Sequence, residues 1–539
     1  MAAQRGLGIS RSIATGNEAD IDVSTCIAAL AEDTATRVIC AALEGCRDGA
    51  RLRAALRACA SAGKPVIVMK VGSSDAGALA AATHTGSLAG TDAVFDAVFR
   101  ECGAFRAKSI EEMIDIAYVC ATGGLPVSDA VTAVTISGGI GVLMADAVAS
   151  CGLRMPAICD ETLGRLRRIL PTVTGVNPID TTAQVANVPG KLAELIEAVQ
   201  ADSPAGTAIL YLSHIGRVPD RFADLRAPLL ALRNQHPELL LVLCGTTVPE
   251  VRTWLETNGI PAFEDPNRAV AAIHGAVRLR ELGTTVIKPP SLRPMPQIDP
   301  GAVMNEQNAK ALLASIGVPV LEERACATAE AAVAAAGTLG YPAVLKILSP
   351  DIAHKTEVGG VLLDLADAEA VRAGFATVMD HVRQAAPAAR LQGVLVSPML
   401  RDGVETIIGI QHDAVFGPMV MFGLGGVFVE LFRDVAFASA PLSAEAARQL
   451  IASVRGANLL AGWRGAAPSC LDALVDALVS IAMLAASNAD LLESLEVNPF
   501  LVGSQGGVAL DALVVLRAGR PEWPLPDLDK ANARISAVL

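Results

Sequence analysis

Two histidines stand in glycine-rich surroundings in opposite halves of the chain. His84 lies in the run Thr-His-Thr-Gly, and His354 comes shortly before the pair Gly359-Gly360. A neutral imidazole nitrogen is a competent nucleophile near neutral pH, so a histidine can carry a phosphoryl group. Glycines leave space and free backbone N–H groups for a transient phosphate. Together these segments predict phosphoryl chemistry, although each histidine alone could be a structural residue beside a turn.

A carboxylate follows the first clear apolar strand. Glu44 comes directly after residues 37–43, and the carboxyl ends of strands line the ligand crevice of open α/β sheets. A carboxylate at that edge can orient an imidazole and stabilise its protonated form. We therefore expect Glu44 to support His84. The alternative is a helix cap or a solvated acid in a turn.

A glycine turn follows another predicted strand and opens a helix. It is the run Ser137-Gly138-Gly139-Ile140-Gly141. The N-terminus of a helix is a natural anion site, so Gly138, Gly139 and Gly141 are candidates for phosphate contacts. The alternative is that these glycines only supply the backbone conformations that the turn requires.

A lysine ends an apolar strand in the last third of the chain. Lys346 is the last residue but one of the run 341–347. A buried lysine needs a partner, and a nucleotide phosphate is one candidate. The alternative is a lysine whose stem is buried and whose ammonium group reaches the surface.

Oxygen donors of the kind that Mg²⁺ prefers stand near the end of the chain. Glu496 and Asn498 lie in one apolar strand, and Asp511 lies in the next. Mg²⁺ is usually held by one or two carboxylates together with nucleotide phosphates. The pattern predicts a hairpin that carries a magnesium site, although acids at the rim of a hairpin can also be merely solvated.

Length and composition place the chain among large globular proteins. It has 539 residues, 52% apolar and 18% charged, which is enough for several domains. A net charge of −13, 3% aromatic residues and the lack of a basic stripe disfavour nucleic acid as a partner. The most apolar helical stretch, residues 474–492, contains acidic residues and is too short for a membrane span. Eleven scattered cysteines without paired spacing indicate reduced thiols in a cytoplasmic enzyme.

Short apolar runs alternate with helical patterns in the first half of the chain. The runs predict parallel strands that are buried on both faces, and they lie at residues 37–43, 64–70, 130–136, 208–212 and 239–243. We expect two three-layer α/β domains, over 1–125 and 126–287. Five prolines between 289 and 300 predict a stiff, extended linker over 288–301. The remainder, 302–539, mixes strands, glycine turns and long helical patterns, as an α+β domain does.

Taken together, these motifs resemble the NDP-forming acyl-CoA synthetases, the ADP-forming acetate–CoA ligase family related to succinyl-CoA synthetase. The resemblance runs over essentially the whole chain. It rests on Gly16–Asp20, the His84 segment, Asn177–Asp180, the His354 segment, Gly423–Asp434 and Glu496–Pro499. It implies an α/β protein with two flavodoxin-like parallel-sheet domains followed by an α+β ATP-grasp domain.

The resemblance also implies a reaction and a set of roles. Members join a carboxylate to CoA with ATP, and release ADP and phosphate through an acyl phosphate and a phosphohistidine. His84 matches the main phosphorylated histidine, Glu44 its supporting carboxylate, and His354 a second histidine that shuttles the phosphoryl group in some members. Lys346 would hold ATP phosphates, and Asn498 and Asp511, with Glu496, would bind Mg²⁺. The remaining nucleotide contacts would come from Val396, Ser397, Pro398, Met399 and Glu405.

The sequence departs from the family at its N-terminus. Full-length members begin with a CoA-binding domain, which is followed by a Ser-Gln-Ser-Gly turn, and neither can be read here. We expect CoA binding to need that domain, from an upstream segment or a partner chain, and a homo-oligomer is also open. The sheet edge near residues 37–43 would then be exposed and apolar. Two other functions remain open: a non-catalytic nucleotide-binding subunit, and an ATP-grasp ligase that forms amides, which would leave His84 without a purpose.

Overall fold

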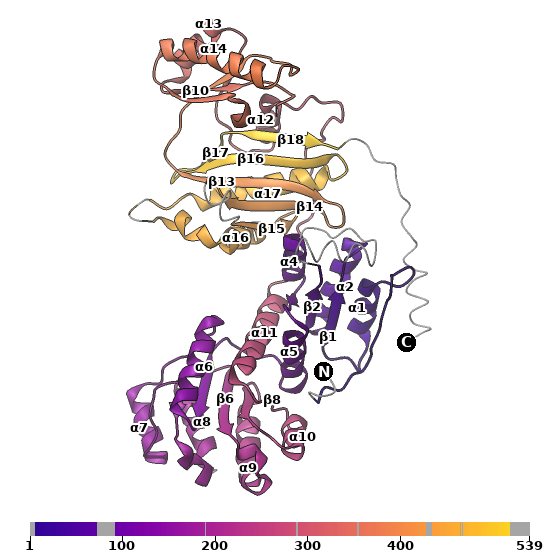
Figure 1. Cartoon of the computed structure of the whole chain (residues 1–539), viewed down its shortest axis with the longest axis vertical. Coiled ribbons are helices and arrows are strands. Elements are labelled where there is room, and N and C mark those ends of the chain that lie inside the picture. The colour runs from indigo at the N-terminus through magenta and orange to yellow at the C-terminus, as the bar shows by residue number, and fades with distance from the viewer. Residues whose placement is uncertain are drawn as a thin grey trace. The chain divides into compact units, whose positions relative to one another are not determined.

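The computed structural model describes residues 6–72, 92–188, 190–286, 289–352, 355–426, 434–463, 465 and 467–517 (Figure 1). The chain forms two compact units. Of the described residues, those in 6–72 and 99–286 belong to one unit, called here the N-terminal unit, and those in 92–98 and 289–517 belong to the other, called the C-terminal unit.

The first α/β domain contains a three-stranded parallel sheet. Its strands are β1 (Ile39–Leu43), β2 (Val66–Lys70) and β3 (Ala104–Arg106), in that spatial order. The helices up to residue 125 are α1 (Val23–Glu32), α2 (Gly49–Ser61), α4 (Asp92–Glu101) and α5 (Ile110–Thr122). Asp22 and Asp48 cap α1 and α2, because each carboxylate accepts a hydrogen bond from an N–H of the first turn. The strands predicted at 37–43 and 64–70 are confirmed.

Strand β1 is exposed on one face, which corrects the prediction that it is buried on both. Ile39, Ala41 and Leu43 are buried, whereas Cys40 and Ala42 are exposed. Residues 39–42 line a pocket, which accounts for the exposure of this part of the strand. The sheet edge expected near residues 37–43 is present, because β1 is the edge strand of the described sheet.

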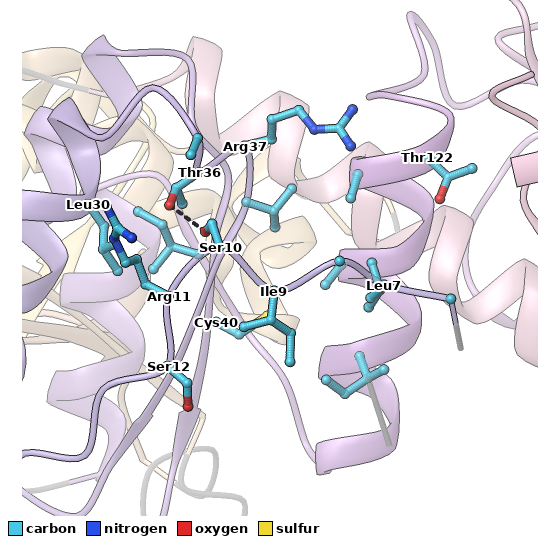
Figure 2. Close-up of a pocket in the computed structure, with 18 of the residues that line it drawn as sticks. Leu7, Ile9, Ser10, Arg11, Ser12, Leu30, Thr36, Arg37, Cys40 and Thr122 are labelled. Carbon is cyan, nitrogen blue, oxygen red and sulfur yellow. Dashed lines mark hydrogen bonds between the residues drawn. The ribbon is translucent and has the colours of Figure 1, made fainter. Parts of the chain in front are cut away.

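A pocket of about 1540 Å³ lies along this edge. Its walls are residues 6–15, residues 35–42, the last turns of α5 and parts of residues 230–259. Figure 2 shows Leu7, Ile9 and Ser10 along the pocket, with Ser10 hydrogen-bonded to Thr36 at 2.8 Å. The pocket is lined by none of the residues that the sequence assigns to chemistry.

The second α/β domain is a doubly wound parallel sheet. Its strands are β4 (Val131–Thr135), β5 (Ile179–Asp180), β6 (Thr207–Ser213), β7 (Leu240–Gly245) and β8 (Ala262–Phe263), in the spatial order β5-β4-β6-β7-β8. This is the flavodoxin-like order. The strands β4 and β7 are buried along their whole length, as their continuous apolar sequences predict.

Helices cover the sheet of the second domain. They are α6 (Gly138–Ser150), α7 (Asp160–Ile169), α8 (Gly190–Asp202), α9 (Pro219–Gln235), α10 (Pro249–Thr257) and α11 (Pro266–Thr284). Short 3₁₀ turns are η2 (Ala183–Asn187) and η3 (Ile215–Arg217).

The C-terminal unit is built on two antiparallel sheets. The smaller sheet has the order β11-β10-β12-β9, from β9 (Arg324–Cys326), β10 (Ala343–Ile347), β11 (Val361–Leu365) and β12 (Val394–Pro398). The larger has the order β15-β14-β13-β16-β17, from β13 (Val404–Asp413), β14 (Gly417–Leu424), β15 (Val435–Ser439), β16 (Leu492–Val502) and β17 (Gly507–Ala509). The strand β18 (Ala512–Leu516) also pairs with β16.

Helices pack on both sheets of this unit. They are α12 (Glu306–Ser315), α13 (Ala329–Leu339), α14 (Ala368–Ala385), α16 (Ala444–Ser453) and α17 (Leu471–Ser487), with 3₁₀ turns η4 (Thr356–Val358) and η5 (Arg455–Ala461). Helices α13 and α14 lie over the smaller sheet, and α17 packs against β13, β14 and β16 (Figure 1). Helix α12 lies between the smaller sheet and β18. None of the helices in the described residues is long and apolar enough to cross a membrane.

The proline-rich linker is extended at its start and anchored at its end. Residues 289–299 have no regular structure. Ile298 is buried in the core of the C-terminal unit, and its N–H donates to Asn488 Oδ1 at 2.9 Å. Asn488 also donates to the carbonyl oxygen of Pro296 at 3.1 Å. In the first half of the linker, away from these anchoring contacts, Leu292 is 58% exposed.

We predict that chymotrypsin cuts this chain first after Leu292. Extended, exposed backbone fits a protease cleft, whereas the anchored residues around Ile298 do not. Mass spectrometry of a time course should show one early fragment pair that ends at Leu292 and begins at Arg293. The Leu292→Gln variant should lose this early cut. Early cleavage within residues 130–280 would contradict the assignment.

Candidate active site

Lys346 lies in the middle of the smaller sheet of the C-terminal unit. It belongs to β10, which pairs with both β11 and β12. Its Nζ donates to Glu306 Oε1 at 2.9 Å and to the carbonyl oxygen of Leu510 at 2.5 Å. Lys346 is therefore held inside the protein, and its first partner is a carboxylate rather than solvent. These contacts do not fit the alternative that the ammonium group of Lys346 reaches the surface.

A second lysine joins the same group. Lys355 Nζ lies 3.1 Å from both carboxylate oxygens of Asp511 and 2.9 Å from Glu306 Oε2. Asp511 Oδ2 lies 3.6 Å from Lys346 Nζ. We call Glu306, Lys346, Lys355 and Asp511 the Glu306 cluster. It places two ammonium groups side by side between one buried and one partly exposed carboxylate.

The charges of this cluster stabilise one another. Burial alone would raise the pKa of Glu306, but Lys346, Lys310 and Lys355 together outweigh it and lower the pKa to about 2. Burial alone would lower the pKa of both Lys346 and Lys355, yet Glu306 and then Asp511 raise both pKa values. Glu306, Lys346 and Lys355 are therefore all ionised at neutral pH, and the cluster holds two positive charges next to each other.

The expected oxygen donors lie on neighbouring segments, but Asp511 lies between two strands rather than within one, which corrects the prediction. Asn498 lies in β16 and Asp511 directly before β18, and the N–H of Asn498 donates to the carbonyl oxygen of Asp511 at 3.3 Å. Asn498 Nδ2 donates to Glu496 Oε1 at 3.0 Å. Among the described residues no three His, Cys, Asp or Glu side chains form a ready-made metal cluster. One carboxylate with neighbouring oxygens fits Mg²⁺, whose other ligands are usually phosphates and water.

The candidate adenine residues lie at the end of β12. Val396 and Ser397 are buried, and β12 pairs with β10 and β9 through this stretch. The N–H of Met399 donates to the carbonyl oxygen of Pro342 at 2.8 Å, where Pro398 ends the strand. In β13, the side chain of Glu405 is exposed and its carbonyl oxygen accepts from Gly425 N–H at 2.7 Å.

The paired glycines after η4 turn the chain sharply. Gly359 has a φ of +67°, and its N–H donates to the carbonyl oxygen of Thr356. The N–H of Gly360 donates to the carbonyl oxygen of Lys355 at 2.8 Å. A Cβ on Gly360 would lie 2.6 Å from Ile347 Cγ2, so the close approach to β10 requires glycine. Both N–H groups are engaged within the chain, and the turn they form fixes the backbone of Lys355.

In the N-terminal unit, the predicted carboxylate lies where the sequence places it. Glu44 is exposed directly after β1, and its carbonyl oxygen accepts from Lys70 Nζ at 2.8 Å. Lys70 is the last residue of β2, opposite Leu43 in the parallel ladder. His84 and His354 both lie outside the described residues. The pairing of Glu44 with His84 thus stays a prediction.

The glycine turn after β4 opens helix α6, as predicted. Within the described residues, the Ser137 side chain makes no capping hydrogen bond, and Gly138 and Gly139 are exposed. This leaves N–H groups of the first turn without a side-chain cap, as an anion site needs. Gly141 is buried instead, and a Cβ there would lie 3.3 Å from Pro178 Cβ. Its role in the structure is close packing of the helix against residue 178.

Sequence reasoning missed two members of the cluster, Glu306 and Lys355. Glu306 is the first residue of α12, after the capping residue Asn305, so it resembles an ordinary acid in the first turn of a helix. Two signals could have identified them. Glu306 and Lys310 have the i,i+4 spacing of an ion pair, and Lys355 directly follows His354.

Comparisons with known proteins identify the family of this chain and two of its domains. A model of the ATP-grasp domain matches residues 299–516, and a model of the succinyl-CoA ligase-like flavodoxin domain matches residues 1–120. The chain is 32% identical over 529 residues to the ADP-forming acetate–CoA ligase I of Archaeoglobus fulgidus, covering 95% of this chain and 75% of the relative. The chain belongs to the ADP-forming acetate–CoA ligase family. Its fold is accordingly two flavodoxin-like domains with an ATP-grasp domain.

Two further members of the family differ in substrate and in subunit organisation. A trans-feruloyl-CoA synthase from an unknown prokaryotic organism is 31% identical over 532 residues, covering 95% of this chain and 73% of the relative. The beta subunit of the ADP-forming acetate–CoA ligase I of Pyrococcus furiosus is 40% identical over 211 residues, covering 39% of this chain and 90% of that subunit. The family thus contains relatives named for different acids, and relatives divided into subunits.

We predict that Asp511→Asn removes most of the dependence of ATP binding on Mg²⁺. The amide keeps the size of the side chain but loses the charge that a hard cation requires. In calorimetric titrations, Mg²⁺ should tighten ATP binding to wild type and to the Asp490→Asn control, whose substitution lies at an exposed site. The Asp511→Asn variant should lose on the order of tenfold in Mg-ATP affinity. An unchanged response to Mg²⁺ would remove Asp511 from the metal site.

Proposed function

We propose that this protein is an acid–thiol ligase that makes acyl-CoA from a carboxylate, CoA and ATP, with release of ADP and phosphate. Membership of the ADP-forming family supports the reaction, and the Glu306 cluster is the observation that carries it. Two buried ammonium groups beside these oxygen donors match the needs of a nucleotide phosphate chain with its cation.

The nucleotide site is assigned to the C-terminal unit. Lys346 and Lys355 bind oxygens of the β- and γ-phosphates, and the backbone of Val396–Met399 with Glu405 holds the adenosine. Asp511, with Asn498 and Glu496, holds Mg²⁺, whose charge screens the phosphates when it is bound. The Gly359-Gly360 turn contributes by fixing the backbone that carries Lys355. Positioning and charge are most of what phosphoryl transfer requires of a protein.

The reaction then proceeds by three transfers. A histidine nitrogen forms a P–N bond as the γ-phosphoryl group leaves ADP. The carboxylate oxygen takes the phosphoryl group from the histidine, which gives an acyl phosphate and returns the free imidazole. The sulfur of CoA attacks the acyl carbon, and phosphate leaves. His84 is the proposed main carrier with Glu44 beside it, and His354 is the proposed second carrier.

The N-terminal unit is assigned to the anionic intermediates. The uncapped start of α6 at Gly138 and Gly139 offers backbone N–H groups to a phosphate. Gly141 lets this helix start close to the sheet. For the domain boundaries we keep residues 1–125, 126–287 and 302–539, joined by the linker 288–301. A partner chain is part of the proposal, because the family includes subunit-divided members.

The carrier histidine can be tested directly. Incubation with Mg²⁺ and γ-³²P-ATP should release ADP and leave a label on the protein that is stable in alkali and lost in acid, because P–N bonds hydrolyse in acid. Peptide mapping should place the label on His84 or His354, and His84→Asn should abolish the stable label. As a control, α-³²P-ATP should leave no label.

Two outcomes would contradict this reaction. One is an acid-stable label on serine or threonine. The other is release of AMP and pyrophosphate instead of ADP when acetate or ferulate and CoA are supplied, because that product pattern belongs to an acyl-adenylate mechanism.

A further inference from the structure

Glu306 is the most buried member of the cluster, and positively charged side chains surround its carboxylate. Its side chain is 1% exposed, and three ammonium groups lie within 3.0 Å of its carboxylate. They come from Lys310 on the next turn of α12, Lys346 in β10 and Lys355 before η4. One carboxylate therefore ties together three separate elements of the unit.

The three ammonium groups do not share Glu306 equally. Oε1 lies 2.9 Å from Lys346 Nζ and 3.0 Å from Lys310 Nζ. Oε2 faces Lys355 Nζ at 2.9 Å and, among the described residues, has no well-aligned hydrogen bond. The contact to Lys355 is thus held mainly by charge. Because Lys346 and Lys355 both contact Glu306, the carboxylate holds their two ammonium groups near each other.

The charges form a chain from the interior to the surface. Glu323, 8% exposed, contacts Lys310 at 2.5 Å, and Lys310 contacts Glu306. Lys346 and Lys355 follow, and Asp511, 26% exposed, lies at the outer end. Three lysines face three carboxylates, so the group is neutral. Asp511 is the outermost of these carboxylates, and it is the one assigned to the cation.

This order has a consequence when a cation occupies Asp511. The carboxylate is then shared with Mg²⁺, and Lys346 and Lys355 lose part of one of their two counter-charges. Glu306 is far less exposed than Asp511, at 1% against 26%, and keeps its contacts with both ammonium groups. The lysines would therefore stay fixed while their outer sides become free for phosphate oxygens. Charges that are already in place, and need no rearrangement, stabilise the transition state of phosphoryl transfer most effectively.

We propose that Glu306 is the positioning residue of the nucleotide site, which holds the ammonium groups of Lys346 and Lys355 for the phosphates without touching them. This inference rests on the proposed function, because it requires phosphates at Lys346. The chain also offers a matched control. Glu323 is a buried glutamate in contact with Lys310, and the structure gives it no contact with Lys346 or Lys355 among the described ion pairs.

The test compares ligands that differ only in their phosphates. Glu306→Gln keeps the shape of the side chain and removes its charge. Calorimetry should show that it weakens Mg-ATP and Mg-ADP binding on the order of tenfold or more, the usual effect of removing a group that orients a ligand-binding residue. Binding of adenosine, followed by NMR titration, should not change. Glu323→Gln should weaken Mg-ATP and Mg-ADP binding much less than Glu306→Gln does and leave adenosine binding unchanged, and Glu306→Asp should recover part of the Mg-ATP affinity.

The outcomes separate this inference from the proposed function. If wild type and Lys346→Met bind Mg-ATP equally, phosphates are not at Lys346 and both fail. If Lys346→Met loses affinity but Glu306→Gln binds like wild type, only the role of Glu306 fails. Equal losses for adenosine and Mg-ATP in Glu306→Gln would mean a purely structural role and would also overturn it.

A second variant serves if Glu306→Gln does not fold. The double variant Glu306→Gln, Lys310→Met removes one charge of each sign and keeps the group neutral. The same comparison of Mg-ATP with adenosine then decides. Selective loss of Mg-ATP affinity supports the inference, and wild-type affinity overturns it.

Discussion

The nucleotide site proposed in the C-terminal unit depends on one buried carboxylate, that of Glu306, whose charge must be compensated by nearby lysines. Glu306 lies in the interior between α12, the smaller sheet and the strands at residues 496–516. Removing one partner of a buried ion pair typically costs about 3–5 kcal/mol, because it leaves a charge without compensation. The positions of Lys346 and Lys355 are therefore fixed by electrostatics, whatever the details of the surrounding loops. That constraint gives the site its geometry before any nucleotide is bound.

The two α/β domains achieve their geometry by a different route. Their parallel sheets place loop residues at the carboxyl ends of strands, where helix N-termini also begin. Glu44 after β1 and the glycine turn after β4 both occupy such positions. The positive ends of helices and free N–H groups provide the charge here, whereas lysines provide it in the C-terminal unit. A phosphoryl group that moves through such a protein is stabilised by both means.

Much of this fold could be predicted from local sequence, because its strands are short apolar runs between turns. Residues 130–136 and 239–243 became buried parallel strands, and Lys346 was expected to be a lysine with a partner. The partner itself could not be predicted. Glu306 precedes Lys346 by forty positions. In the sequence it looks like an ordinary acidic residue in the first turn of a helix. Only the packing of α12 against the two sheets brings them together. The exposed face of β1 was also misjudged, since an apolar strand sequence does not reveal whether both faces of the strand are covered.

The central claim is that the Glu306 cluster is where the protein meets the phosphates of ATP. A crystal structure with Mg²⁺ and a non-hydrolysable ATP analogue tests it most directly. The account predicts phosphate oxygens within hydrogen-bond distance of Lys346 Nζ, Asp511 turned from Lys355 toward the cation, and Glu306 still in contact with both lysines. Phosphates bound away from Lys346, with the Lys355–Asp511 ion pair intact, would contradict it.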